Sequence, residues 1–304
     1  MTGLADALGP LFLLILLGAV LNRLRQPSAD FWAQLESFIY FLLFPAMLVS
    51  TLATADVSQV PVGPVAITLI GTMGAFGIAL WTLRGWLHLE GAAFTSAFQG
   101  ALRMNTYVGV AGAVALHGTP GATVAAVAVA IMVPTVNVMC VASFIASGTL
   151  GSASFGKSLA TLVRNPLIIG SVLGITLNVS SIGLPGWSEA TAELLGRAAL
   201  PLGLIAVGVA LRPVALLRID RSVWATNIVK LVLMPALTLV LALVLGLDPV
   251  SRDVAVLFSA LPTATSSYIL ARQLGGDADM MAALITKQTL LAMLTLPLWL
   301  HLAG

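Results

Sequence analysis

Two short polar stretches lie in the middle of long apolar segments, and their side chains could bind a small charged solute. The first is LRMNTYVG (102–109), and the second is LPTATSSY (261–268), which contains a proline and five hydroxyl groups. Guanidinium, amide and hydroxyl groups can hydrogen-bond a ligand or a freed backbone group. The candidate binding residues in these stretches are Arg103, Asn105, Thr106, Tyr107, Pro262, Thr263, Thr265, Ser266 and Ser267.

The position of these stretches predicts that two membrane helices are broken near the bilayer midplane. Arg103 lies about 11 residues into its apolar segment, or roughly 16 Å at 1.5 Å per residue. Pro262 lacks an N–H and clashes with the preceding helical turn. Irregular backbone survives at that depth only where protein or a water-filled cavity satisfies it. Half-helix ends carry partial charges, so two antiparallel broken helices that cross would form a site for a charged solute. The alternative is a proline kink whose Ser and Thr side chains bond back to their own helix.

The composition indicates an all-α polytopic membrane protein. Of 304 residues, 59% are hydrophobic and 9% are charged, and the mean hydropathy is +1.04, far from the range of water-soluble domains. One cysteine, Cys140, excludes a disulfide framework within the chain and a multi-cysteine metal site. The 14 basic residues are scattered rather than clustered, which argues against nucleic-acid binding. We also expect no metal, cofactor or enzymatic activity, because no HExxH motif and no carboxylate pair lies within an apolar segment.

Ten apolar segments are long enough to cross a hydrocarbon core about 30 Å thick. Basic residues gather at the ends on one side, nine against two, so that side is expected to be cytoplasmic and both termini outside. The first segment has no basic region before it and is expected to be a span rather than a cleaved signal. The expected location is the bacterial inner membrane. The expected spans are 6–23, 31–54, 61–83, 92–117, 121–147, 158–179, 194–212, 222–246, 250–274 and 279–302.

The two halves of the chain share a sequence pattern that predicts a duplication. Residues 9–24 align with 165–180 at an offset of 156, which pairs two prolines, two glycines and two asparagines. A nearby offset of 159 places the first polar stretch over the second. Five spans in each half require the second copy to enter the membrane upside down, as in many secondary transporters. We therefore expect a first inverted repeat at 1–147, a linker at 148–157 and a second inverted repeat at 158–304.

The charged residues within the spans favour an anionic substrate. All twelve acidic residues lie at or near span ends, so a cation-coupling carboxylate is not expected at the membrane centre. Arg103 needs an anion, carbonyl groups or water as a partner. Lys230 is expected to extend its side chain to the membrane surface, whereas Lys287 could do so or could face a cavity. Asn137, Lys287 and Gln288 complete the candidate substrate contacts.

Two segments carry a resemblance to a known family. ALRMNTYVGVAGAVALHG (101–118) and ALPTATSSYILARQLGGD (260–277) resemble the fourth and ninth helices of the auxin efflux carrier family, and FLLFPAMLVSTL (41–52) resembles its second helix. Bacterial members of the family include proteins assigned to malonate transport. Asn105 matches the asparagine of the fourth-helix crossover, and Pro262 matches the proline of the ninth. Met104 stands where plant members have a proline, and the linker is far shorter than the plant cytosolic loop.

The resemblance implies a ten-helix fold similar to that of the bile acid sodium symporters. Helices 1, 2, 6 and 7 would form a scaffold, and helices 3–5 and 8–10 a transport domain around crossed helices 4 and 9. The implied function is secondary transport of a small organic anion, malonate or a related mono- or dicarboxylate, by an elevator-like movement. The alternatives are an anion channel or a membrane sensor that does not transport. Expected partners are the organic anion and the lipid bilayer, and a homodimer is an open possibility.

Overall fold

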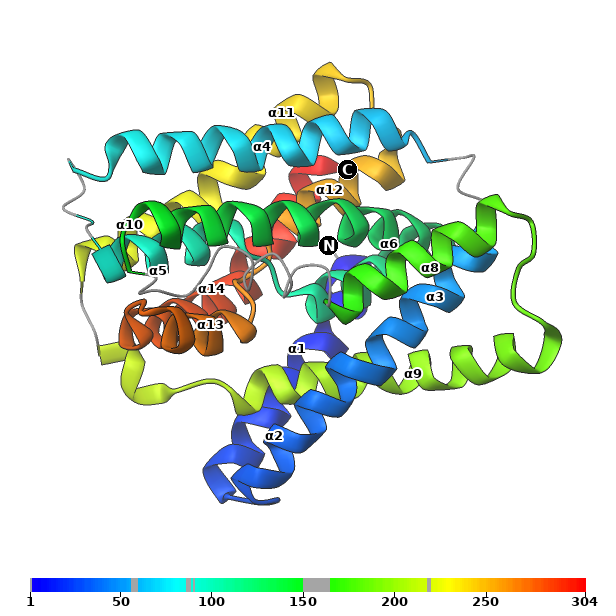
Figure 1. Ribbon diagram of the computed structural model, residues 1–304, viewed down its shortest axis with the longest axis horizontal. Helices are drawn as coiled ribbons and strands as arrows, with labels where there is room; N and C mark the ends of the chain where they lie inside the picture. Colours follow the sequence, from blue (N-terminus) through cyan, green and yellow to red (C-terminus); the bar gives the residue numbers. More distant parts are fainter. Residues whose placement is uncertain (1, 56–59, 86–88, 90, 150–164, 218–219) are drawn as a thin grey trace.

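The computed structural model describes residues 2–55, 60–85, 89, 91–149, 165–217 and 220–304, and every regular element in these ranges is a helix (Figure 1). The helices of the first half are α1 (Thr2–Leu24), α2 (Ala29–Phe38), η1 (Ile39–Leu43), α3 (Phe44–Thr54), α4 (Val62–Leu83), α5 (Gly91–Leu102) and α6 (Thr106–Ala146). Those of the second half are α8 (Pro166–Val179), α9 (Gly186–Val209), η3 (Pro213–Leu217), α10 (Arg221–Ile228), η4 (Val229–Leu233), α11 (Met234–Val244), α12 (Pro249–Ala260), α13 (Ser266–Leu274) and α14 (Ala278–Ala303).

Polar side chains fix several helix starts. Asn165 accepts hydrogen bonds from the first turn of α8, and Asp248 accepts one from Ser251 at the start of α12. Asp220 and Asp277 cap α10 and α14 in the same way. A side-chain oxygen at this position satisfies a backbone N–H that has no partner within the helix. These four short polar residues therefore fix the starts of α8, α10, α12 and α14.

Seven helices in the described ranges are long and apolar enough to cross a membrane. Most coincide with the expected spans, but α9 starts at Gly186 instead of residue 194. Pro185 precedes its first turn, and Glu189 lies within that turn, where a carboxylate interacts favourably with the helix dipole. The residues between Gly186 and the expected start at 194, including the exposed Glu189 and Glu193, form an additional N-terminal part of this helix. Residues 150–157 of the expected linker and 158–164 of the expected sixth span lie outside the described residues.

Two spans contain a wide helical turn directly before a proline. The π-helical turns η1 and η4 precede Pro45 and Pro235, which occupy the first turns of α3 and α11. Proline offers no N–H to the preceding turn and clashes with the carbonyl there. A π turn accommodates that clash without ending the helix. Helices α2, η1 and α3 thus run on as one rod, as do α10, η4 and α11.

The two polar stretches interrupt their helices. Residues 103–105 separate α5 from α6, and residues 261–265 separate α12 from α13. The first interruption is shorter than the second. Met104 lies within it, at the position where plant members of the auxin efflux carrier family have a proline. A further change of direction follows at Gly118, whose φ of 59° divides α6 into two helical parts. The irregular backbone therefore lies within the fold, as the polar residues predicted.

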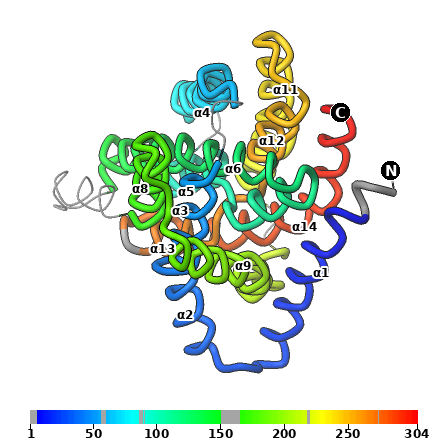
Figure 2. Tube along the Cα trace, turned by 90° about the vertical axis from the view of Figure 1, so that its right-hand side faces the viewer, coloured from blue at the N-terminus to red at the C-terminus, as the bar shows by residue number. Residues whose placement is uncertain are grey.

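Helices α1, α2 and α9 lie along one side of the molecule, and α4 and α11 lie along the opposite side (Figures 1 and 2). Helix α1 packs on α9, and α3 packs on both α8 and α9. The broken-helix segments α5 and α12 both pack against α14 and η4, and α5 also packs against α10. The two broken helices are thus enclosed by other helices.

The contact between α1 and α9 is close enough to require glycine. A side chain on Gly18 would overlap the backbone carbonyl of Ile205, and one on Gly208 would overlap that of Ile15. Gly174 of α8 makes a similar approach to α3, where a Cβ would lie 3.1 Å from the carbonyl oxygen of Leu48. Small residues allow membrane helices to pack backbone to backbone. These contacts hold α1 to α9 and α8 to α3.

The exposed surface is strongly apolar. Large hydrophobic side chains on outer helices are mostly exposed, including Leu13 at 66%, Ile78 at 69%, Val244 at 76% and Leu294 at 75%. Soluble proteins rarely expose wide contiguous apolar surface. Hydrocarbon tails would cover such a surface without cost, so the exposed faces fit a lipid environment.

Candidate functional site

The two interruptions touch each other through their backbones. The N–H of Asn105 donates to the carbonyl oxygen of Pro262 at 2.8 Å. Gln288 of α14 joins them a second time, because its Oε1 accepts from the Thr263 N–H at 2.8 Å and its Nε2 donates to the Gly100 carbonyl at 3.0 Å. Gly100 stands in the last turn of α5, where carbonyl groups lack helical partners. One amide side chain thus satisfies orphan groups from both broken helices.

Hydroxyl groups satisfy further polar atoms at the crossing. The Thr263 hydroxyl lies 3.4 Å from the carbonyl of Gln99 and 3.2 Å from the Ser267 hydroxyl. Thr263 and Ser267 are fully buried at 0% exposure, as is Gln288. Buried polar groups without partners are costly, so this network stabilises the irregular backbone. Thr263, Ser267 and Gln288 therefore hold the crossing together.

Two half-helices begin at the crossing and direct their N-termini toward it. Asn105 caps α6 by accepting from the Val108 N–H at 3.4 Å. Helix α13 starts at Ser266, after Thr265, whose side chain makes no capping bond. A helix N-terminus carries partial positive charge and unpaired N–H groups, which favour a nearby anion. The crossing therefore presents two such ends.

A cavity of about 450 Å³, here called the Arg103 cavity, adjoins the crossing. The polar residues that line it are Tyr40, Arg103, Thr106, Asn137, Asn165 and Ser266, and apolar residues complete its walls. The Arg103 Nη2 donates to the Asn137 Oδ1 at 2.7 Å. The Arg103 Nε is buried and has no hydrogen-bond partner among the described residues. A guanidinium with a free donor, beside hydroxyl groups and helix N-termini, suits a carboxylate.

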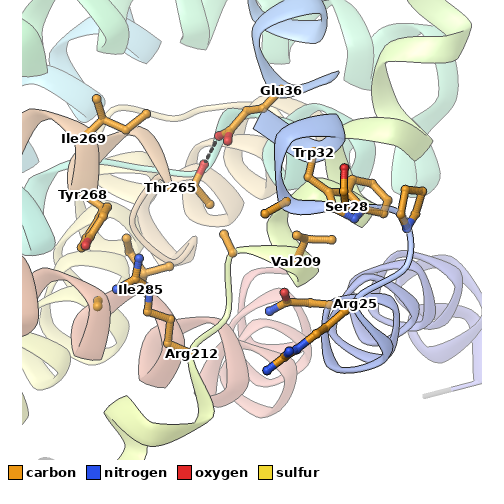
Figure 3. Close-up of a pocket in the computed structure, with 15 residues that line it drawn as sticks. Arg25, Ser28, Trp32, Glu36, Val209, Arg212, Thr265, Tyr268, Ile269 and Ile285 are labelled. Atoms are coloured by element: carbon orange, nitrogen blue, oxygen red, sulfur yellow. Dashed lines mark hydrogen bonds between the residues drawn. The ribbon is translucent and has the colours of Figure 1, made fainter. Parts of the chain in front are cut away.

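A second cavity of about 670 Å³, here called the Glu36 cavity, lies on the other side of the α13 start. Thr265 donates from its hydroxyl to Glu36 Oε1 at 2.9 Å, and Arg25 and Arg212 lie on the far wall (Figure 3). The Arg212 guanidinium stacks over the Tyr268 ring, 4.3 Å from its centroid. Thr265 and Ser266 are adjacent, so the start of α13 separates the two cavities.

The other candidate residues occupy different places. Asn105 and Pro262 form the backbone of the crossing. The Tyr107 ring meets Phe44 edge to face, with centroids 4.8 Å apart, and lines neither cavity. Lys287 is buried on α14 with its ammonium 5.3 Å from the centroid of Trp224, also away from both cavities. The structure thus brings Arg103, Thr106, Asn137 and Ser266 to one cavity and Thr265 to the other.

The expectation that Lys230 reaches the membrane surface is wrong. Lys230 is 0% exposed, and its Nζ has no hydrogen-bond partner among the described residues. It belongs to η4, which packs against α5, α12 and α14. The side chain therefore points into the bundle, where no route to the surface is open.

Sequence reasoning also missed Glu36. The acidic residues were all expected near span ends, yet Glu36 reaches the interruption between α12 and α13. It is the eighth residue of α2 and has an apolar run after it, and this is the signal that pointed to a deeper position. Arg25 and Arg212 were placed correctly at span ends, but their common cavity was not foreseen. No cluster of three metal-ligating side chains occurs in the described part of the chain.

Comparisons with known proteins point to membrane transport proteins. A family model described as "Membrane transport protein" matches residues 150–300. A Rhizobium meliloti protein named "Putative malonate transporter" is 27% identical over 94% of this chain and 91% of its own length. A Methanothermobacter thermautotrophicus protein named "Uncharacterized transporter" is 23% identical over 98% of this chain and 97% of its own length.

The comparisons confirm the resemblance found in the sequence, and the relatives align along nearly the whole chain. Their names indicate transport rather than catalysis. Together with the apolar exposed surface, they identify a multi-pass membrane protein. Residues 150–300 match the membrane transport protein family, in agreement with the resemblance of the chain to the auxin efflux carriers.

Proposed function

We propose that this protein is a secondary transporter of a small organic anion, malonate or a related mono- or dicarboxylate, which binds in the Arg103 cavity. The observation that carries the proposal is the Arg103 guanidinium, whose Nε has no partner among the described residues, in a cavity beside two helix N-termini. Arg103 is partly buried and has no acidic partner among the described residues; such a cation is costly, and a substrate carboxylate would reduce that cost. The name of the Rhizobium meliloti relative agrees with this substrate class.

The proposed fold has ten spans in two inverted repeats. The helical stretch Gly91–Ala146 has 56 residues, roughly 84 Å of helix, which is enough for two crossings that divide at Gly118. Helix α8 and the pair α12 and α13 supply the remaining two. Reciprocal packing supports the symmetry: Gly18 of the first span packs on the seventh, whereas Gly174, its repeat counterpart, packs on the second.

The proposed mechanism is an elevator-like movement of spans 3–5 and 8–10 against a scaffold of spans 1, 2, 6 and 7. The contacts α1 to α9, α3 to α8 and α3 to α9 support a scaffold of this composition. Within the described residues, few polar contacts join the proposed scaffold to the proposed moving spans. One of them is the hydrogen bond from Thr265 to Glu36. A small set of such contacts can be exchanged during movement without a large loss of energy.

The proposed state is open toward the cytoplasm in an inner-membrane orientation with both termini outside. The Glu36 cavity includes Arg25 and Arg212, and the Arg103 cavity reaches Leu274 and Asn165. These residues lie near span ends on the side that carries most basic residues, which is cytoplasmic by the positive-inside rule. Both cavities therefore lead from the crossing to the same side.

Substrate counterflow in proteoliposomes tests the proposal. Liposomes loaded with unlabelled malonate should accumulate labelled malonate transiently and saturably. Arg103→Ala and Asn105→Ala should each reduce this uptake at least tenfold while folded protein remains in the membrane. Arg197→Ala is the matched control, because this arginine is exposed and pairs with Glu193 far from the crossing.

The counterflow and binding results also distinguish a transporter from a channel and from a sensor. Flux without saturation or counterflow would indicate a channel, and binding without flux would indicate a sensor. Unchanged counterflow in both crossing variants would remove the site assignment.

A further inference from the structure

Glu36 places a carboxylate directly beside the interruption between α12 and α13. The Thr265 hydroxyl donates to Glu36 Oε1 at 2.9 Å (Figure 3). Glu36 is half-buried and forms no salt bridge within the described residues. Its negative charge is therefore not cancelled by a close cation, and it acts on whatever binds at the start of α13.

The charged and titratable groups around Glu36 are few. Arg25 and Arg212 lie on the opposite wall of the cavity and are exposed, so solvent screens their charges. Tyr268 lies under the Arg212 guanidinium. Tyr107, on α6, interacts electrostatically with Glu36 and with Tyr40.

Helix α9, which packs on α2, has no charged side chain directed at Glu36 among those described. Glu193 and Arg197 are exposed and bond to each other. At the crossing itself, the described residues therefore supply one guanidinium, from Arg103, and one carboxylate, from Glu36.

The two cavities are separated by a single peptide unit. Thr265 lines the Glu36 cavity, and Ser266 lines the Arg103 cavity. A carboxylate bonded to Ser266 would thus lie on the order of 10 Å from the Glu36 carboxylate. At an effective dielectric constant of about 20, each negative charge there loses roughly ten- to thirtyfold in affinity through repulsion.

We propose that Glu36 is a specificity-determining residue that admits carboxylates as monoanions and discriminates against dianions. The inference rests on the proposed function, because it assigns the charge state of the substrate in the Arg103 cavity. Arg103 compensates one negative charge on the substrate. A second negative charge meets Glu36 without a further cation close by. A dicarboxylic acid is therefore bound with one carboxyl group protonated, and that proton travels on the substrate.

The test compares malonate with monomethyl malonate, which has nearly the same shape and only one ionisable group. Both compete for counterflow of labelled malonate at a pH well above the second pKa of malonic acid, where free malonate is a dianion. The variants are Glu36→Gln, which keeps an acceptor for Thr265, and Asp30→Asn. Asp30 lies on the same helix in an exposed position, so its variant changes the net charge equally.

The wild type should prefer the monoester at least tenfold. Glu36→Gln should reduce this preference by roughly ten- to thirtyfold, and Asp30→Asn should leave it unchanged. Raising the pH should reduce malonate uptake by the wild type, because the monoanion disappears, and should affect Glu36→Gln much less. Equal preferences in the wild type and Glu36→Gln would overturn the inference and leave the transporter proposal standing. Absence of labelled-malonate counterflow in the wild type at every pH, including pH values at which the monoanion is abundant, would overturn the transporter proposal, and the inference with it.

Discussion

Replacing Gln288 by methionine should destabilise the protein strongly, although neither the charge nor the shape of the side chain changes much. Gln288 is fully buried and bonds the Thr263 N–H at 2.8 Å and the Gly100 carbonyl at 3.0 Å. Methionine would leave both backbone groups buried and unpaired. Each such group costs about 1–3 kcal/mol, so the expected loss is about 2–6 kcal/mol. The crossing should loosen first, because this side chain joins its two halves.

Thermal and denaturant unfolding of the purified protein in detergent provide the assay. Thr289→Val is the matched control, since Thr289 is the next residue of α14, is equally buried, and bonds only to Ile285 of its own helix. The control should lose less than about 1 kcal/mol, in the range of single side-chain hydrogen bonds in membrane proteins. If Gln288→Met lost no more than Thr289→Val, the reasoning that this amide satisfies the broken helices would be refuted.

Three further experiments test separate features. Gly208→Ala should prevent recovery of monodisperse protein in size-exclusion chromatography, because the new Cβ overlaps the α1 backbone, whereas Gly9→Ala, with open space around it, should behave as wild type. Lys230→Met should keep or raise the thermal stability, since the buried ammonium has no hydrogen-bond partner among the described residues; a clear loss would show that Lys230 has a counter-charge. A double-mutant cycle on His117 and Asp253, which lie 3.0 Å apart, should show a coupling of about 0.5–3 kcal/mol in unfolding, and additive effects would contradict the contact.

The interruptions could be found from sequence because a proline and clustered polar residues inside an apolar segment have few structural explanations. Pro262 and Asn105 marked both sites, and their backbone contact is the feature that the repeat pattern indicated. Helix starts were less predictable. Helix α9 begins at Gly186, eight residues before the expected span start at 194, and the acidic Glu189 in its first turn suits a helix N-terminus.

Contacts between distant residues account for what the sequence did not reveal. Glu36 and Thr265 are 229 positions apart, and no local pattern relates them. The hydrogen bond between Arg103 and Asn137 could not be predicted from sequence either. Asn137 was a candidate only because it is a polar residue in an apolar span. Lys230 was misjudged because span depth does not reveal which neighbours surround a side chain. Its burial depends on the packing of η4 against three other helices.

Equilibrium binding of labelled malonate to purified protein, measured for the wild type and for Arg103→Gln, tests the central claim most directly. The claim is that the cavity beside the crossed interruptions holds the carboxylate through the Arg103 guanidinium. Loss of a charge-assisted hydrogen bond costs about 1.5–3 kcal/mol, so the variant should bind malonate at least tenfold more weakly while unfolding at nearly the same temperature. Equal affinities in the two proteins would contradict it.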